Sequence, residues 1–223
     1  MVAERDCILA DFFESFDNGV GMFTHGWGNG IDTSTPGQVT ISGNSGMMER
    51  PWSADSGTGY GTYTVTASLQ GDEAGPAILL WPADDVWPGG EFDIAEIVNG
   101  TVYGVTHAKG SGGWDEYESV YYNGVDESEV HTYTLDWQPG SITYSVDGKV
   151  YGTVEGDIVG KDYDDGGVNV VFSAMNRNAN TSVTVYDVSY TAYNGDVSDD
   201  ADIAVNAGAD FGVGVSANSD IWG

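Results

Sequence analysis

The segment 130–154, VHTYTLDWQPGSITYSVDGKVYGTV, alternates polar and apolar residues and is interrupted by two turn sequences. Successive residues of a strand point to opposite faces, so this alternation is typical of strands with one buried face. The turn sequences QPGS (138–141) and DGK (147–149) place glycine after Pro or Asp, where it supplies the positive φ of a tight turn. The segment therefore predicts antiparallel strands joined by hairpins.

The same signals continue on both sides of this segment. Turn residues recur along the chain, and no sustained helical period interrupts them. The run AILLW (77–81) is continuously apolar, which indicates a strand that is covered on both faces. We therefore predict two antiparallel sheets with little helix, and the other strand-like segments lie at 59–69, 91–98, 101–108, 119–124, 167–176 and 182–193.

Length and composition set the fold class. A chain of 223 residues with 33 Gly and many Val, Thr and Tyr suits one all-β domain, and we predict a β-jelly-roll sandwich of two antiparallel sheets. We assign residues 1–193 to this domain, which the chain enters near FFESFDNG (12–19). Residues 194–223 are rich in Gly, Ala and Asp and have no Lys or Arg, which is typical of a linker, a repeat edge or a solvated tail.

The chain is strongly acidic. Its 35 Asp and Glu against six Lys and Arg give a net charge of −29, which argues against nucleic acid and anionic membranes as partners and favours neutral solutes. The acidity fits a saline habitat, where salt screens self-repulsion, and it fits an ordinary acidic secreted protein equally well. Cys7 is the only cysteine, so no intrachain disulfide forms, and no apolar run reaches membrane-spanning length.

Three carboxylates, Glu91, Asp93 and Glu96, lie within six residues of the run GGEFDIAE (89–96). Regular alternation would put Glu91 and Asp93 on one face of a strand and Glu96 on the other. One extra residue between Asp93 and Glu96, inserted as a β-bulge, resets the alternation and turns all three carboxylates to one face. Crowded carboxylates repel each other and are costly to bury, so we interpret them as a functional site.

The spacing of these carboxylates suits the hydrolysis of glycosidic bonds. If the strand is curved, the carboxyl groups of Glu91 and Glu96 approach the ~5–5.5 Å of a retaining glycosidase, rather than the ~6.5–9.5 Å that admits an inverting water. Asp93 lies between them and can share a proton with either.

The segment WPGGEFDIAE (87–96) resembles the signature of glycoside hydrolase family 16, in which Trp-Pro precedes Glu-x-Asp-x-x-Glu on a bulged strand of a concanavalin-like jelly roll. This form of the motif resembles the laminarinase-type branch, and GYGTYTV, HTYTLDWQPGSITYSVDG and VYDVSY extend the resemblance over most of residues 12–193. The resemblance implies an endo-acting retaining enzyme with a concave substrate cleft. It also implies that Glu91 is the nucleophile, Asp93 its helper and Glu96 the acid/base.

The resemblance further implies a polysaccharide substrate and chemistry that requires no cofactor. We expect a β-1,3- or mixed-linkage β-1,3-1,4-glucan. A bacterial exopolysaccharide or a marine galactan is the alternative, since loops beside the cleft set the linkage preference and the motif does not determine their shape. A non-catalytic carbohydrate-binding module on the same sandwich is a second class, and a calcium-dependent adhesive module, suggested by the acidic tail, is a third. The presence of all three carboxylates favours the enzyme.

Three residues near the motif are candidates for substrate binding. Trp87 precedes the motif, and we expect it to stack on a sugar ring, with core packing as the alternative. His107 is expected to bond to a substrate hydroxyl or to Asp93, with a structural role in the sheet as the alternative. Trp114, in the Gly-rich loop GSGGWDEY (110–117), is expected to be exposed and to border a subsite.

Other candidates lie farther along the chain. The resemblance places Trp137 in the cleft, although a core position is equally open, and Asn176 with Arg177 closes a strand where sugar contact is expected. The resemblance also implies a structural calcium ion on the convex face, held by a backbone carbonyl and by side chains near the first and last strands. Glu14 and Asp187 match those places, and both are otherwise ordinary surface acids.

The resemblance also bears on localisation. We expect a secreted monomer, although the first residues, MVAERDCILADFF, lack the basic start, apolar stretch and small-residue site of a signal peptide. Export would then depend on a signal outside this sequence or on another route.

Overall fold

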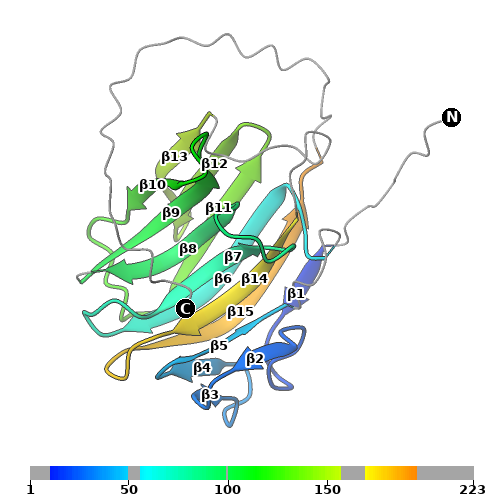
Figure 1. Cartoon of the computed structure of the whole chain (residues 1–223). Coiled ribbons are helices and arrows are strands. Elements are labelled where there is room, and N and C mark those ends of the chain that lie inside the picture. Colours follow the sequence, from blue (N-terminus) through cyan, green and yellow to red (C-terminus); the bar gives the residue numbers. More distant parts are fainter. Residues whose placement is uncertain (1–10, 50–55, 99, 157–168, 195–223) are drawn as a thin grey trace, which may run out of the picture.

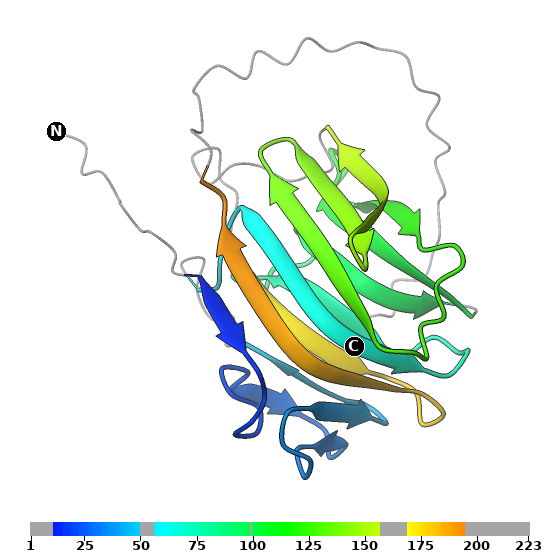
Figure 2. The same cartoon turned by 180° about the vertical axis from the view of Figure 1, so that it is seen from behind.

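The computed structural model describes residues 11–49, 56–98, 100–156 and 169–194 (Figures 1 and 2). All elements in these ranges are β-strands, and they form two antiparallel sheets that pack face to face. The predicted all-β sandwich is therefore confirmed. The acidic segment assigned to 194–223 lies outside the described residues except for Asn194, as does Cys7.

One sheet has eight strands. They are β1 (Phe12–Glu14), β3 (Ile31–Asp32), β4 (Val39–Ser42), β6 (Gly61–Gln70), β11 (His131–Gln138), β12 (Ser141–Val146), β13 (Lys149–Glu155) and β15 (Ser182–Ala192). Their order is β13-β12-β11-β6-β15-β4-β3, and β1 pairs with β15 at one side. This sheet is nearer the viewer in Figure 2.

The other sheet has seven strands and is nearer the viewer in Figure 1. They are β2 (His25–Trp27), β5 (Ser45–Met48), β7 (Ala77–Pro82), β8 (Glu91–Val98), β9 (Thr101–Lys109), β10 (Asp115–Tyr121) and β14 (Val170–Asn176). Their order is β10-β9-β8-β7-β14-β5-β2, so β8 lies inside the sheet, between β9 and β7. A strand in this position is held on both edges by hydrogen bonds, which suits it to carry a rigid site.

The hairpins predicted within 130–154 are present. Strands β11, β12 and β13 pair in sequence as antiparallel neighbours. Gly140 and Gly148 occupy the two turns with φ of 78° and 76°, which glycine adopts without the steric cost that a Cβ imposes.

The main core fills the space between the sheets and is rich in aromatic side chains. Phe172 of one sheet meets Tyr63 of the other edge to face, with ring centroids 5.4 Å apart. Phe92 meets Trp137 in the same way at 5.0 Å. Full burial of each such side chain contributes about 1.5–3 kcal/mol to the free energy of unfolding, so these contacts hold the sheets together.

The outer face of the seven-stranded sheet carries a second, smaller apolar cluster. In β7, Ile78 and Leu80 enter the main core, whereas Leu79 and Trp81 join this second cluster. The prediction that AILLW is covered on both faces is therefore confirmed. The described part of the chain contains no helix that is long and apolar enough to cross a membrane.

Candidate active site

Strand β8 contains the predicted bulge. Its register with β9 moves from Asp93↔Val105 to Glu96↔Tyr103, so three steps on β8 match two on β9. Its register with β7 shifts at the same place. Phe92, Ile94, Ala95 and Ile97 all belong to the main core. Two adjacent inward residues, Ile94 and Ala95, leave Glu96 on the same face as Asp93, as expected for a bulge.

We call the outer face of the seven-stranded sheet, which carries Glu91, Asp93 and Glu96, the carboxylate face. On β9 the residues opposite these three are His107, Val105 and Tyr103. Directly paired residues share a face, so His107 and Tyr103 flank the carboxylates. On the other side, the neighbours on β7 belong to the second apolar cluster.

Glu91 and Asp93 are almost completely buried, with 5% and 3% of their surface exposed. Burial raises the pKa of Glu91 well above its ordinary value, and the charge of Asp93 adds to this effect. Burial likewise raises the pKa of Asp93, whereas its hydrogen bond with His107 lowers it. Ionisation of Glu91 or of Asp93 therefore disfavours ionisation of the other, and positive neighbours favour the ionised forms.

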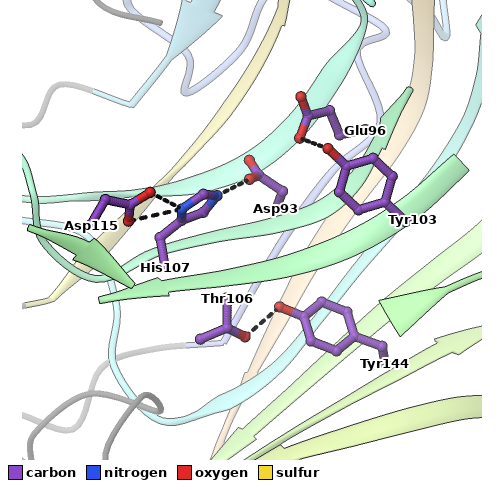
Figure 3. Close-up of polar contacts among 7 residues, drawn as sticks. All are labelled: Asp93, Glu96, Tyr103, Thr106, His107, Asp115 and Tyr144. Atoms are coloured by element: carbon purple, nitrogen blue, oxygen red, sulfur yellow. Dashed lines mark hydrogen bonds and ion pairs between the residues drawn. The ribbon is translucent and has the colours of Figure 1, made fainter. Parts of the chain in front are cut away.

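Glu96 is the third carboxylate of the row and is less buried than the other two. The Tyr103 hydroxyl donates a hydrogen bond of 3.0 Å to its Oε2 (Figure 3). Burial raises the pKa of Glu96 to about 7, the charge of Asp93 adds to this, and the Tyr103 hydrogen bond opposes it. Glu96 therefore exchanges a proton with its surroundings near neutral pH, as a general acid and base must.

His107 lies between two carboxylates. Its Nδ1 is 3.1 Å from both carboxyl oxygens of Asp115, and its Nε2 is 3.5 Å from Asp93 Oδ2 (Figure 3). Burial alone would lower the pKa of His107, but the bonds to Asp115 and Asp93 outweigh it and raise the pKa to about 11. The imidazole is therefore a cation fixed beside Asp93, as one of the two predicted roles of His107 requires.

Arg177 follows β14 and supplies a second positive charge. Burial lowers its pKa, whereas the charges of Glu91 and Glu96 raise it, which places the guanidinium within electrostatic reach of both carboxylates. Its backbone N–H donates to the Gly75 carbonyl at 3.1 Å and fixes the chain there.

Two predicted substrate residues lie in or near the site. Trp87 stacks on Trp81, with centroids 5.6 Å apart and an interplanar angle of 15°, and meets the His107 ring edge to face at 5.5 Å. Trp114 is 78% exposed in the loop between β9 and β10, so its predicted exposure is confirmed. Contact of either residue with sugar stays a prediction.

Two predicted substrate residues are not available to a substrate. Trp137 is 2% exposed and packs in the main core between Phe92 and Tyr60. Asn176 is fully buried, its Nδ2 donates to the carbonyls of Gly43 and Asn178, and its Oδ1 accepts from Thr181 Oγ1 at 2.5 Å. Placement of these two residues in the substrate site is therefore wrong, because one is core and the other closes a loop.

Sequence reasoning missed two polar residues of the site, Tyr103 and Asp115. Both contact the site through cross-strand register, Tyr103 from β9 and Asp115 from the start of β10. The alternation of TVYGVTHA puts Tyr103 and His107 on one face, so Tyr103 could have been found beside His107. Asp115 had no comparable signal, since the length of the loop decides its position.

The predicted calcium ligands lie on neighbouring strands. Glu14 of β1 pairs with Val188 of β15, so Asp187 is one residue away and points to the opposite face. Glu14 Oε1 accepts from the Phe16 amide at 2.8 Å, and Asp187 Oδ1 accepts from Thr66 at 3.0 Å. Among the described residues no group of three or more His, Cys, Asp or Glu could hold a metal. Glu14 and Asp187 do not form a donor set by themselves because they point to opposite faces, and a calcium ion near these strands stays a prediction.

Glycoside hydrolases use a pair of carboxyl groups, one as acid and base and the other as nucleophile or base. The carboxylate face of this sandwich offers such a pair, in which the charge of one group affects the pKa of the other. The chain belongs to glycosyl hydrolases family 16, whose profile matches residues 26–193. No curated protein sequence matches the chain.

Solved structures share the fold at low identity. The laminarinase catalytic domain from Thermotoga maritima MSB8 has a TM-score of 0.61 and 15% identity, and the match covers 82% of this chain and 98% of that one. The Bacillus licheniformis β-glucanase gives 0.60 and 17%, with the same coverage. A protein from human gut microbiota, described under endo-acting O-glycanases that initiate mucin breakdown, gives 0.51 and 17%, covering 67% and 62%.

The Tyr103 bond to Glu96 generates a titration prediction. A hydroxyl that bonds to the charged form of a carboxyl lowers its pKa, so Tyr103→Phe should raise the pKa of Glu96 above its value of about 7. The titration is followed by NMR of carboxyl-labelled glutamate, with Glu96→Gln to assign the signal. A pKa that stays in place or falls in Tyr103→Phe would contradict the arrangement.

Calcium generates a second prediction. An ion that binds only the native state stabilises it by about 2.7 kcal/mol at a free concentration a hundredfold above Kd, which corresponds to several degrees in Tm. Excess chelator should lower the Tm of the wild type, and Asp187→Asn should remove the difference between calcium and chelator. Equal melting of the wild type in both would eliminate calcium at this site.

Proposed function

We propose that the protein is an endo-acting retaining hydrolase of a neutral β-1,3- or mixed-linkage β-1,3-1,4-glucan, with Glu91 as nucleophile and Glu96 as acid/base. The observation that supports this proposal best is the bulge in β8, since it brings three carboxylates, two of them buried, onto one sheet face where their protonation depends on one another. Family membership supports the reaction class.

In this reaction two displacements occur at one anomeric carbon. The Glu91 carboxylate attacks that carbon as the glycosidic C–O bond breaks, and Glu96 gives its proton to the leaving oxygen. Glu96 then takes a proton from water, whose oxygen attacks the same carbon and releases Glu91. The products are two shorter chains, one with a new reducing end of retained configuration, and both carboxyl groups return to their starting state.

The positive groups favour the charged form of the nucleophile and oppose the effect of burial. The His107 charge lowers the pKa of Glu91, and Arg177 interacts favourably with the same carboxylate. Asp93, held by His107, separates Glu91 from Glu96 along the strand. During glycosylation Glu91 loses its charge in the new bond, and Glu96 becomes a carboxylate when it gives its proton to the leaving oxygen. The charge of Asp93 raises the pKa of both groups and so adjusts their protonation, which gives Asp93 the role of a helper.

The charge around the site favours an uncharged substrate. In the described residues, the cations that act on Glu91 and Glu96 are His107 and Arg177, and both already face protein carboxylates. The whole chain carries a net charge of −29. A sulfated galactan or a uronate polymer would meet repulsion at long range and would find its potential counter-ions engaged.

Aromatic side chains extend the carboxylate face toward the edge of the sheet. Tyr117 and Tyr121 of β10 lie opposite His107 and Tyr103 in register, and they are 43% and 54% exposed. With Trp87 across the site, these rings offer flat apolar surfaces next to polar groups, which is the mixture that a sugar chain requires. The similar solved structures include a laminarinase and a β-glucanase, which supports the choice of a glucan substrate.

The proposal also includes the localisation, the oligomeric state and a structural ion. Secretion, a monomeric state and a structural calcium ion are consistent with hydrolysis of a polymer outside the cell, and the chemistry itself uses only side chains of this chain.

Substrate panels test the proposal. The purified protein should release reducing ends from laminarin and lichenan with an early fall in viscosity, because internal cleavage shortens chains faster than it frees sugars. It should release at least tenfold less from a sulfated galactan. Glu91→Ala is the matched inactive control. If the wild type releases no reducing ends from any of these polysaccharides, the proposed hydrolase activity is refuted.

The configuration of azide products tests the two roles separately. Glu96→Ala should hydrolyse polysaccharide about 10²–10⁴-fold more slowly, because the acid is lost. With an activated β-glucoside and azide it should give the β-glycosyl azide through Glu91. Glu91→Ala should give the α azide by direct attack, whereas Asp93→Asn should slow the reaction without altering configuration. Swapped azides, or near-normal polysaccharide activity in either Glu variant, would contradict the assignment.

A further inference from the structure

The bulge that orders the site has an unusual residue at its centre. Ile94 has no Cα partner on either neighbouring strand described: β7 pairs with Asp93 and then Ala95, and β9 pairs with Asp93 and then Glu96. Ile94 is fully buried. Its backbone carbonyl lies inside the sandwich, where an unpaired polar group is costly.

The Tyr122 hydroxyl donates a hydrogen bond of 2.6 Å to this carbonyl. Tyr122 follows β10 and is 1% exposed, and burial raises its pKa, so the hydroxyl keeps its proton and remains a donor. Its ring is held by Tyr151 of β13, edge to face at 5.3 Å, and by Tyr133 of β11 at 6.0 Å. Residues of the eight-stranded sheet therefore fix the position of a hydroxyl that bonds to the seven-stranded sheet.

Gly104 provides the space for this bond. It lies between Tyr103 and Val105 of β9, directly across from the bulge. A Cβ at Gly104 would lie 2.5 Å from the Tyr122 hydroxyl and would also collide with the ring of Tyr144. A side chain at Gly104 would therefore displace Tyr122 from the Ile94 carbonyl.

We infer that Tyr122 is a positioning residue, which locks the bulge through the Ile94 carbonyl and so holds Glu96 beside Asp93 and Glu91 on the carboxylate face. This role rests on the proposed function of those carboxylates. Tyr122 itself points into the core and touches no reacting atom. It acts through the backbone, since the position of the Glu96 side chain depends on the two bulge residues that precede it.

The bond should matter more for the rate than for substrate binding. The reacting groups must be held to a fraction of an ångström, and a displacement of about 1 Å costs on the order of 100-fold in rate. A bulge without its lock lets Glu96 move relative to Glu91, while the rings that contact the sugar stay in place. The loss should therefore appear in kcat and not in KM.

Tyr122→Phe tests this role, with Tyr190→Phe as the matched control. Tyr190 also donates its hydroxyl to a backbone carbonyl, that of Tyr60 at 2.8 Å, but it lies on β15 in the other sheet. Both variants should lower Tm. We expect kcat on the best glucan of the panel to fall about 10- to 100-fold in Tyr122→Phe with KM within twofold, and both constants to stay within twofold in Tyr190→Phe.

Hydrogen exchange gives a second readout that does not depend on activity. The amides of Ala95 and Glu96 should exchange at least tenfold faster in Tyr122→Phe than in Tyr190→Phe, after correction for global stability. Gly104→Ala should reproduce both effects because it displaces the hydroxyl without removing it. Equal kcat and equal exchange at the bulge in Tyr122→Phe and Tyr190→Phe would overturn the role of Tyr122. An inactive wild type would instead refute the proposed function, and the exchange rates would still decide whether Tyr122 locks the bulge.

Discussion

One inserted residue in β8 determines the arrangement of the whole site. A regular strand with the sequence EFDIAE would point Glu96 into the core, next to Phe92 and Ile94, where a carboxyl group would face only apolar side chains. Because of the bulge, Ala95 points inward beside Ile94, and Ile97 follows it into the core. The core thus gains two apolar residues, and Glu96 reaches the outer face. The hydrophobic effect and the cost of a buried charge therefore favour the same irregular backbone. The position of the reacting carboxylates therefore depends on a β-bulge, and the packing of the core favours this bulge.

The electrostatics of the site follow from this crowding. Three carboxylates on one face of a protein with a net charge of −29 would repel each other strongly if all were ionised. Burial is the main cause of the raised pKa values of Glu91, Asp93 and Glu96, and the charge of Asp93 raises those of Glu91 and Glu96 further. His107 limits the effect, because Asp115 keeps it charged from the other side. The strand pair β9–β10 thus supplies the counter-charge that lets the acids of β8 differ in protonation, which acid and base catalysis requires.

Local rules were enough to predict the fold and the motif from the sequence. Alternation and turn glycines predicted the hairpins of 130–154, and the bulge was predicted because only a bulge puts Glu91, Asp93 and Glu96 on one face. Trp137 shows where the argument went wrong, since it shares the alternation of Tyr133 and Leu135, which face the core, and the same rule would have put it there. Asn176 and Asp115 were beyond such rules. The amide of the first is used by loops that are distant in sequence, and the second meets His107 only because β9 and β10 pair in one register.

The inner face of the seven-stranded sheet explains why such a site needs a sandwich and not a single sheet. On β9, Gly104 leaves room for the Tyr122 hydroxyl, and two residues later Thr106 bonds to the hydroxyl of Tyr144, which rises from β12 of the other sheet (Figure 3). These polar contacts lie just beneath the strand that carries His107 and Tyr103 on its outer face. An open sheet would leave the bulge carbonyl to water and free to shift, because water holds no fixed direction. Tyr133 and Tyr151 of the second sheet hold the Tyr122 hydroxyl on the bulge carbonyl in place of water. The packing on the inner side of the sheet therefore sets the precision of the carboxylates on its outer side.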